Sequence, residues 1–393
     1  MQPAPDARPA AAHIRHIWFQ PTETFLHTCV RSFRRSAPLL VGYEHVHAES
    51  FPVDAPVIPL YPRGSWRARW NARCPEWLGG DPLARFDTQR ARAALAAHGA
   101  QVIHAHFGQT GYGVLALKRH TGLPLVTTFY GADASQRARM PVWPERYAEL
   151  FSEGELFLAE GPQLAARLVE LGCPAEKVAV HPIVIEPERY AYRERAPKAR
   201  GERVQLFFCS RLCEKKGLRF ALQALARARE KQPNLVLHVG GDGPDAAISH
   251  ALVEELDLTG AVRFLGFLSH DRFLAELDAA DIFLQPSVTA ADGDSEGGAP
   301  TTLLEAQACG VPILATRHAD IPHVVADGAS GLLCDERDVD GLSENLLALL
   351  ATPERWSSMG RAGRTYIESH HAALPQTRRL EDRYLEIVNA CER

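Results

Sequence analysis

The sequence predicts an α/β fold of two doubly wound domains that face each other across a cleft. Short apolar runs alternate with segments of helical period, which is the pattern of parallel βαβ units. The pattern stops in a polar, charged stretch at 186–202 and then begins again. The length of 393 residues also exceeds what one ordinary core accommodates. Because ligands of such sheets bind at the carboxyl ends of the strands, we expect the active site between the domains.

Helical segments separate the expected strands in both halves of the chain. In the first half the strands are expected at 14–19, 39–41, 102–107, 125–129, 156–159 and 178–180. In the second half they are expected at 204–209, 235–239, 262–265, 282–284, 312–315 and 332–334. We therefore expect a first domain at 1–195 and a second at 196–370, followed by an amphipathic helix in 371–393.

The overall composition excludes some classes of function. A formal net charge of -5 argues against a general nucleic-acid binder. No run approaches the roughly 18 apolar residues that a membrane-spanning helix needs, and the first dozen residues lack the pattern of a signal peptide. We therefore expect a cytoplasmic protein without a nucleic-acid partner.

Two glutamates, Glu296 and Glu305, bracket a glycine-rich helix start. Pro300 has the fixed φ that suits the first turn of a helix. That turn carries unpaired N–H groups and the positive end of the helix dipole, and Gly297 and Gly298 let a ligand approach the backbone. The run therefore predicts a binding site for an anion, most naturally a phosphate.

A cationic loop at 210–217 follows the first strand of the second domain. Arg211 offers a planar guanidinium and Lys216 a compact charge, and together they suit a diphosphate leaving group. Taken alone, the loop is more typical of a solvated charged turn. The glycine-rich helix start downstream favours phosphate binding. At 264–268 another strand runs into a loop, where a flat base could lie against Leu268.

In their order along the chain, these motifs resemble those of the family 4 retaining glycosyltransferases of the GT-B fold, which has two Rossmann-like domains. The resemblance is greatest to enzymes of exopolysaccharide and colanic acid biosynthesis. It is carried by matches at 211–212, 216–217, 241–244, 264–266, 296–297, 304–306 and 310–312. The family's last helix crosses back to the first domain, and the resemblance implies the same for 371–393.

The resemblance implies transfer of a sugar, with retention, from a UDP- or GDP-linked donor to a hydroxyl of a saccharide or lipid-linked acceptor, without a metal. It implies that Arg211 and Lys216 bind the donor diphosphate, Glu305 the ribose and Glu296 the sugar. The remaining expected donor-side residues are Gly297, Gly298, Thr301 and Leu268. By itself, Glu305 would more often be a charge on a helix surface.

The spacing of the two glutamates departs from the family. Eight residues lie between Glu296 and Glu305 where family members usually have seven. The extra residue falls within 297–299. It is either absorbed as a bulge before the helix or it moves the sugar-facing role toward the backbone of Gly297.

The first domain carries residues that resemble the family's acceptor side. Residues 130–133 resemble its His-Gly-x-Asp segment, with Tyr130 at the position of the histidine. Asp133, at a strand end, is expected to act in catalysis by orienting a donor or acceptor hydroxyl. His106 is as compatible with the cleft as with a hydrogen-bonded core position. Glu23 and Thr24 follow the first strand and are expected to help shape the acceptor site.

Two patterns compete with this interpretation. Asp292-Gly293-Asp294 spells the DxD of metal-dependent glycosyltransferases, but those enzymes have another fold, so we expect no metal here. The two glutamates also match the acid and nucleophile of a glycosidase. A hydrolase, however, has no need of the cations at Arg211 and Lys216.

The segment at 61–92 mixes aromatic and basic residues, among them Trp66, Arg67, Arg69 and Trp70. This composition suits peripheral contact with an anionic membrane at its inner face, and a lipid-linked acceptor would make such contact useful. Tryptophans packed in a core beside solvated arginines explain it equally well.

We thus expect a glycosyltransferase, a hexosyltransferase of cell-surface or exopolysaccharide synthesis. Two alternatives remain: a nucleotide-sugar-binding protein without turnover, and an epimerase of the same fold that acts on a nucleotide sugar.

Overall fold

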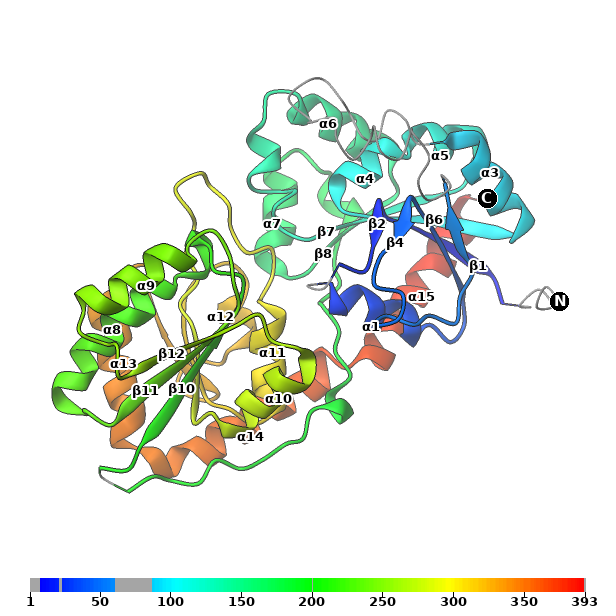
Figure 1. Ribbon diagram of the computed structural model, residues 1–393. Coiled ribbons are helices and arrows are strands. Elements are labelled where there is room, and N and C mark those ends of the chain that lie inside the picture. The colour runs from blue at the N-terminus through cyan, green and yellow to red at the C-terminus, as the bar shows by residue number, and fades with distance from the viewer. Residues whose placement is uncertain (1–7, 21–22, 61–86, 200, 392–393) are drawn as a thin grey trace. The chain divides into compact units, whose positions relative to one another are not determined.

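The computed structural model describes residues 8–20, 23–60, 87–199 and 201–391, and these form two compact units (Figure 1). The first unit is Met1–Ile185 with Ala373–Arg393, and the second is Glu186–Ala372. The sequence prediction placed the junction near residue 195 instead. Residues 186–195 go with the second unit because Tyr190 and Arg195 donate hydrogen bonds to its residues, Tyr190 to Glu305 and Arg195 to the Cys309 carbonyl.

The first unit contains a parallel sheet in the strand order β5-β3-β1-β6-β7-β8-β9. Its strands are β1 (Ala10–Ile14), β3 (Ala37–Gly42), β5 (Val57–Pro59), β6 (Ala100–His106), β7 (Leu125–Phe129), β8 (Leu156–Ala159) and β9 (Val178–Val180). Two short strands, β2 (Ile17–Trp18) and β4 (Glu44–His45), pair separately. The strand expected at 14–19 is therefore placed differently. The buried alanines of β1 belong to a stretch that reads as low complexity, and the chain forms the short β2 beyond it.

Helices pack on this sheet and bury its apolar side chains. They are α1 (Thr24–Ser32), α3 (Thr88–Ala97), α4 (Gly108–Gly113), α5 (Leu115–Thr121), α6 (Trp143–Glu153), α7 (Pro162–Glu170) and α15 (Ala373–Cys391). The last helix, α15, packs Leu380 and Tyr384 against Val102, Val126 and Leu158 of the sheet. The end of the chain therefore contributes to the core of the first unit.

The second unit contains a parallel sheet in the order β12-β11-β10-β13-β14-β15. Its strands are β10 (Val204–Cys209), β11 (Leu235–Gly240), β12 (Val262–Gly266), β13 (Ile282–Gln285), β14 (Ile313–Thr316) and β15 (Gly331–Cys334). Each lies within one residue of its expected position. Strands buried on both faces read as continuous apolar runs, so the sequence locates them well.

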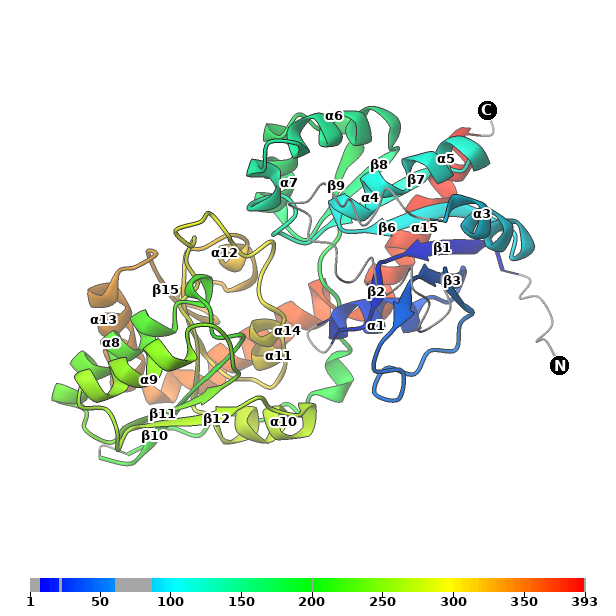
Figure 2. The same cartoon turned by 45° about the horizontal axis from the view of Figure 1, so that its top comes forward.

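Helices cover both faces of the second sheet (Figures 1 and 2). One face carries α8 (Leu218–Lys231), α9 (Ala246–Glu255) and α13 (Val339–Ala351), and the other carries α10 (His270–Ala279), α11 (Thr301–Ala308) and α14 (Trp356–His370). The short α12 (Ile321–Val324) follows β14.

Both sheets reverse their strand order once, as Rossmann-like sheets do. In the first unit the reversal lies between β1 and β6, and in the second between β10 and β13. The loops that leave two such neighbouring strands diverge, and ligands of open α/β sheets bind where they diverge. The loops after β10 and β13 and those after β1 and β6 are therefore the candidate ligand-binding loops of the two units.

Among the described residues, no helix has the length and apolar character needed to cross a membrane. Trp66, Arg67, Arg69 and Trp70, expected to contact a membrane, lie outside the described residues.

Candidate functional site

The loops after β10 and β13 approach each other so closely that a glycine is required between them. Gly217 ends the first loop with a φ of +71°, and a Cβ atom there would lie 1.7 Å from the carbonyl oxygen of Pro286. Beside this contact, the N–H of Val288 donates to the carbonyl of Lys215 at 2.8 Å. Backbone contacts therefore align the cationic loop with the glutamate loop, which is the loop at 286–300 that carries Glu296.

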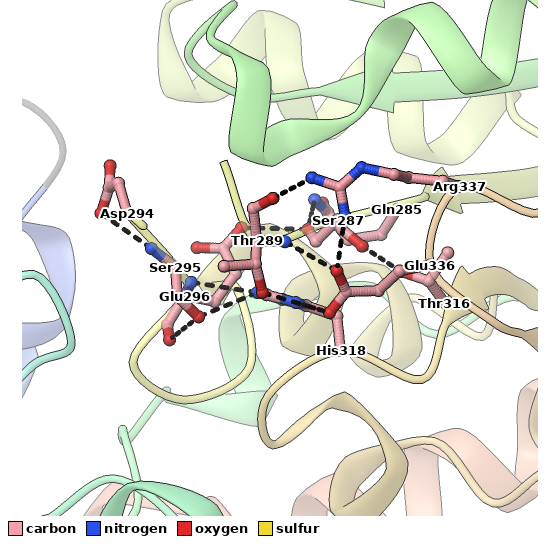
Figure 3. Close-up of polar contacts among 10 residues, drawn as sticks. All are labelled: Gln285, Ser287, Thr289, Asp294, Ser295, Glu296, Thr316, His318, Glu336 and Arg337. Atoms are coloured by element: carbon pink, nitrogen blue, oxygen red, sulfur yellow. Dashed lines mark hydrogen bonds and ion pairs between the residues drawn. The ribbon is translucent and has the colours of Figure 1, made fainter. Parts of the chain in front are cut away.

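Lys216 and Glu296, both expected in the donor site, form an ion pair across these loops. The Lys216 Nζ lies 2.7 Å from Oε1 and 2.8 Å from Oε2 of Glu296. The Ser287 hydroxyl donates to the same carboxylate at 3.0 Å (Figure 3). Burial by itself raises the pKa of Glu296, but the charges of Lys216 and Lys215 and the Lys216 hydrogen bond hold it below its usual range. Glu296 is therefore an ionised acceptor, suited to a sugar hydroxyl.

The neighbouring Lys215 donates hydrogen bonds to residues of the glutamate loop. Its Nζ lies 3.0 Å from Asp294 Oδ1 and 3.1 Å from the carbonyl oxygen of Ser295. Asp292 accepts a hydrogen bond from the N–H of Asp294 at 2.9 Å. The DxD segment therefore closes a turn, with the charge of Asp294 balanced by a lysine.

Four other expected donor residues belong to the two loops that carry this ion pair or to the start of α11. Arg211 is exposed in the loop after β10, and its side chain makes no ion pair with any acid that the structure describes. Gly297 and Gly298 precede α11, which begins at Thr301 with Pro300 as the residue before it. The N–H groups of Thr301 and Thr302 in its first turn have no acceptor within the helix, whereas that of Leu303 donates to the carbonyl of Pro300 at 3.0 Å. Arg211, which pairs with no described acid, the paired Lys216 and the start of α11 thus belong to adjoining loops.

Glu305 is buried within α11, only 5% exposed, so it is not the surface charge of the alternative interpretation. The hydroxyl of Tyr190 donates to its Oε1 at 2.8 Å. Burial raises the pKa of Glu305 to about 7, although the hydrogen bond from Tyr190 opposes the shift. Sequence reasoning missed Tyr190, because it lies in a polar stretch that reads as a linker.

Replacing Glu305 with glutamine should remove a pH dependence of stability. The folded state holds the Glu305 proton up to a pKa of about 7, whereas the unfolded chain releases it near 4.5. The free energy of unfolding therefore falls as pH rises between these values. Relative to the Gln variant, the protein should lose about 3 kcal/mol between about pH 5 and about pH 8, measured by urea unfolding. In Tyr190→Phe the decline should extend to higher pH. Parallel pH profiles for all three proteins would contradict this account.

Leu268, expected to contact the base, is 9% exposed and packs on Gly240 at the end of β11. A Cβ atom on Gly240 would lie 2.7 Å from Leu268 Cδ1. The neighbouring Phe267 is 69% exposed. Contact between Leu268 and a base stays a prediction.

In the first unit, Asp133 joins the loops after β6 and β7. Its Oδ2 accepts from the N–H of Gly108 at 2.8 Å, and its Oδ1 accepts from the N–H of Tyr130 at 3.0 Å. Burial raises the pKa of Asp133, and these N–H groups oppose that shift. Both carboxylate oxygens thus hold backbone in place. The expected catalytic role of Asp133 stays a prediction, and the geometry adds a positioning role.

Replacing Asp133 with asparagine should destabilise the first unit by about 2 kcal/mol, because one of the two N–H groups would then face an amide donor. Urea unfolding measures the loss. Asp87→Asn is the matched control, since Asp87 caps α3 through a single N–H, that of Arg90, at 3.0 Å. An equal loss in both variants would contradict the assignment of two acceptors to Asp133.

His106 belongs to a buried hydrogen-bonded cluster with His13 and His104. The Nδ1 of His106 lies 2.7 Å from the hydroxyl of Tyr130, and its Nε2 lies 3.1 Å from Nδ1 of His13. His104 bonds to the hydroxyls of Tyr384 and Thr128. Burial lowers the pKa of all three histidines, so they are neutral.

The three histidines lie close enough together to suggest a metal site. Their hydrogen bonds, however, already use every ring nitrogen except Nε2 of His13. The cluster is therefore better described as a hydrogen-bonded part of the core that Tyr130 joins. An acceptor-side role for His106 and Tyr130 stays a prediction.

Glu23, also expected on the acceptor side, is buried and paired with Arg15. The Nη2 of Arg15 lies 2.5 Å from Glu23 Oε1, and its guanidinium carbon lies 3.8 Å from the centre of the Phe107 ring. Thr24 begins α1 directly after Glu23. Phe107 has a φ of 75°, a strained conformation at the end of β6. Sequence reasoning missed Arg15, because its position directly after β1 carries no motif.

Two family descriptions match the chain, one in each half. "Glycosyltransferase Family 4" matches residues 45–189, and "Glycosyl transferases group 1" matches residues 192–366. The amylovoran biosynthesis glycosyltransferase AmsK of Erwinia amylovora is 33% identical over 285 residues, which are 70% of this chain and 69% of that protein. A protein of Escherichia coli K12 named colanic acid biosynthesis glycosyltransferase WcaL is 36% identical over 252 residues. That match covers 63% of this chain and 61% of WcaL.

Solved structures share the fold across nearly the whole chain. Anabaena HepE in complex with UDP has a TM-score of 0.75 at 15% identity, with 96% of this chain and 100% of that chain covered. Sucrose-phosphate synthase from Thermosynechococcus elongatus has a TM-score of 0.73 at 16% identity, with coverage of 98% and 100%. The fold is the GT-B fold, as the motifs of the second domain implied. By its sequence relatives and by both family matches, the chain belongs to glycosyltransferase family 4.

Proposed function

We propose that this protein is a retaining glycosyltransferase that moves a sugar from a nucleotide diphosphate to an acceptor hydroxyl in exopolysaccharide synthesis. The observation that carries the proposal is the Lys216–Glu296 ion pair beside the start of α11, at the reversal point of the second sheet. An anion-binding helix start, two cations and an ionised acceptor suit a diphosphate joined to a sugar. The relatives AmsK and WcaL, both named for polysaccharide biosynthesis, support the biological setting.

In this proposal the second unit binds the donor. Lys216 and Arg211 neutralise the diphosphate as its bond to the sugar breaks, which lowers the barrier by stabilising developing charge. Glu296 accepts a hydrogen bond from the sugar, and Glu305 accepts from the ribose hydroxyls. No protein nucleophile is required, because the leaving diphosphate can take the acceptor's proton on the same face of the sugar. Catalysis then rests on positioning and charge stabilisation.

The proposal includes a UDP- or GDP-linked donor and a saccharide or lipid-linked acceptor. HepE has been solved with UDP, and several relatives are named as GDP-mannose-dependent mannosyltransferases, so both nucleotides are reasonable first choices. A thermal-shift screen with UDP, GDP and their sugars should raise the unfolding temperature for one nucleotide series, since a ligand bound only to the folded state stabilises it.

Product analysis with and without acceptor tests the reaction itself. A glycosyltransferase releases the nucleoside diphosphate and lengthens the acceptor only when an acceptor is present. A nucleotide-sugar-binding protein gives a thermal shift without products, and an epimerase converts the donor in the absence of acceptor. Either of these outcomes would replace the proposed function.

We also propose peripheral membrane contact through Trp66, Arg67, Arg69 and Trp70, which a lipid-linked acceptor would favour. The protein should pellet together with vesicles of anionic phospholipid when they are sedimented at low salt. Arg67→Glu with Arg69→Glu should leave it in the supernatant.

A further inference from the structure

His318, which is buried, and Glu336, which is partly exposed, form a hydrogen-bonded pair that contacts the main chain of Glu296. His318 follows β14, is 1% exposed, and lies with its Nδ1 2.6 Å from Oε1 of Glu336, which follows β15. Its Nε2 accepts a hydrogen bond from the N–H of Glu296 at 3.1 Å and lies 3.2 Å from the hydroxyl of Ser295 (Figure 3). The pair therefore connects two strand-end loops to the glutamate expected to face the sugar.

These contacts require one tautomer of His318. A backbone N–H can only donate, so Nε2 must carry a lone pair, and the ring proton must lie on Nδ1 and be donated to Glu336. Burial by itself raises the pKa of Glu336, but hydrogen bonds from His318 and from the N–H of Thr289, with the charge of Arg337, hold it below its usual range. Glu336 is therefore an ionised acceptor that selects this tautomer.

The residue after each member of the pair has a positive φ, which is energetically unfavourable for a residue with a side chain. Ala319, directly after His318, has a φ of 45°, and Arg337, directly after Glu336, has a φ of 64°. In the part of the chain that the structure describes, only six residues other than glycine have a positive φ. Residues with side chains keep such conformations only where the surroundings impose them, and they gather at functional sites.

His318 holds the main chain of Glu296 while other groups hold its side chain. Lys216 and Ser287 bind the carboxylate, and Gln285 donates to Ser287 at 2.8 Å. Glu296 is thus held from the loops after β10, β13 and β14. The extra residue between the glutamates must then be accommodated after Glu296, in 297–299, where two glycines precede α11.

We propose that His318 and Glu336 are positioning residues for glycosyl transfer, which fix the backbone of Glu296 so that its carboxylate meets the donor sugar despite the longer glutamate loop. The inference rests on the proposed function. His318 touches Glu296 and Glu336 does not, so Glu336 acts through the tautomer that it imposes on the ring.

Three variants separate positioning from simple packing. His318→Leu keeps an apolar side chain and removes the acceptor for the Glu296 N–H. His318→Gln can place its amide oxygen near the position of Nε2 and keep that acceptor. In Glu336→Gln one amide must face both the Thr289 N–H and the His318 ring, although it has a single acceptor atom, so Nδ1 loses its acceptor or the ring changes tautomer.

The Leu variant and Glu336→Gln should lower kcat for sugar transfer about 10- to 100-fold, because a small misplacement of a reacting group has a large effect on rate. Affinity for UDP or GDP, each titrated calorimetrically, should change by less than about threefold, because the diphosphate contacts remain. His318→Gln should recover about tenfold of the rate lost in the Leu variant.

Glu276→Gln is the matched control. His238 Nδ1 lies 2.8 Å from Glu276 Oε2, a His–Glu pair of similar geometry in the same unit. The His238–Glu276 pair has no hydrogen bond to Lys216, Ser287, Glu296 or His318. Breaking this pair should therefore leave kcat within about twofold of the unaltered protein. An equal decrease in Glu276→Gln and Glu336→Gln would show a general effect of removing such a pair and would overturn the proposal.

A second measurement does not depend on activity. In the protein labelled with nitrogen-15 histidine, the His318 resonances, assigned by their loss in His318→Gln, should show a proton on Nδ1 and none on Nε2. A proton on Nε2 would overturn the positioning role even if sugar transfer is observed. If the expected tautomer is found but no acceptor or nucleotide sugar supports transfer, the proposed function fails while the pair's hold on the loop stands.

Wild-type kcat in His318→Leu, or equal rates in the Leu and Gln variants, would also overturn the inference.

Discussion

Replacing Lys216 with methionine should lower kcat for sugar transfer by about 100-fold, which corresponds to about 3 kcal/mol in the barrier. The Lys216 ammonium lies at the end of the loop after β10, and it already neutralises Glu296 from 2.7 Å. Charge develops on the diphosphate as the bond to the sugar breaks, and a fixed cation there acts more strongly in the transition state than in the ground state. The effect should therefore appear mainly in kcat.

Lys216→Met also leaves Glu296 buried without its cation, so the pKa of Glu296 should rise toward its usual range or above it. The residual activity of the variant should consequently fall more steeply at acid pH than that of the unaltered protein. Arg211→Ala should give a rate loss of similar size without this pH effect, because Arg211 is exposed and pairs with no described acid. Full activity in either variant would disprove the diphosphate role.

Lys118→Met provides the control for losing a half-buried ion pair. Lys118 lies 2.8 Å from Glu155 in the first unit, and its side chain is 17% exposed, against 16% for Lys216. The two substitutions should therefore cost similar stability, whereas only Lys216→Met should slow transfer. A comparable rate loss in Lys118→Met would indicate that activity follows stability alone.

Replacing Gly217 with alanine should destabilise the second unit by about 3 kcal/mol or more. The new Cβ would lie 1.7 Å from the carbonyl oxygen of Pro286, and a backbone oxygen cannot move aside as a flexible side chain can. The two loops would have to separate, which also breaks the hydrogen bond from Val288 to Lys215. Nucleotide binding should therefore weaken together with stability, measured by urea unfolding and by calorimetry.

Gly328→Ala separates this clash from the cost of a left-handed backbone. Gly328 has a φ of +77°, close to the +71° of Gly217, but nothing lies within 4 Å of a Cβ placed there. Its replacement should cost only about 1 kcal/mol and leave nucleotide affinity unchanged. If both alanine variants lose the same stability, the approach of Gly217 to Pro286 is looser than the structure has it.

The strands of the second unit were predictable because a parallel sheet covered on both faces needs continuous apolar segments, as in Val204–Cys209. In the first unit β1 was displaced, since its alanines give no such signal, and the short β5 was missed. Glycines in turns were also informative about the site. Gly217, for example, is part of a motif because its positive φ and its approach to the Pro286 carbonyl leave no room for a side chain.

The residues of the candidate site also divide into those that the sequence predicted and those that only the structure shows. Lys216, Glu296 and Glu305 could be named from local motifs, because cations and a glycine-rich helix start have a chemical meaning wherever they occur. Tyr190, Arg15 and His318 could not be named, since each acts on a residue far away in the chain or through a loop contact. Tyr190, for example, bonds to Glu305 across 115 positions of sequence.

The sequence by itself determined the α/β class, the parallel strands of the second sheet, the donor-site motifs and the family resemblance. These depend on periodicity and on the chemistry of neighbouring residues. Only the tertiary structure decided that Glu305 is buried and hydrogen-bonded, that Asp133 holds two backbone N–H groups, and that Glu296 is held by Lys216, Ser287 and His318. Burial and hydrogen bonding depend on which loops the sheet brings together, and strand order, rather than distance along the chain, sets that arrangement.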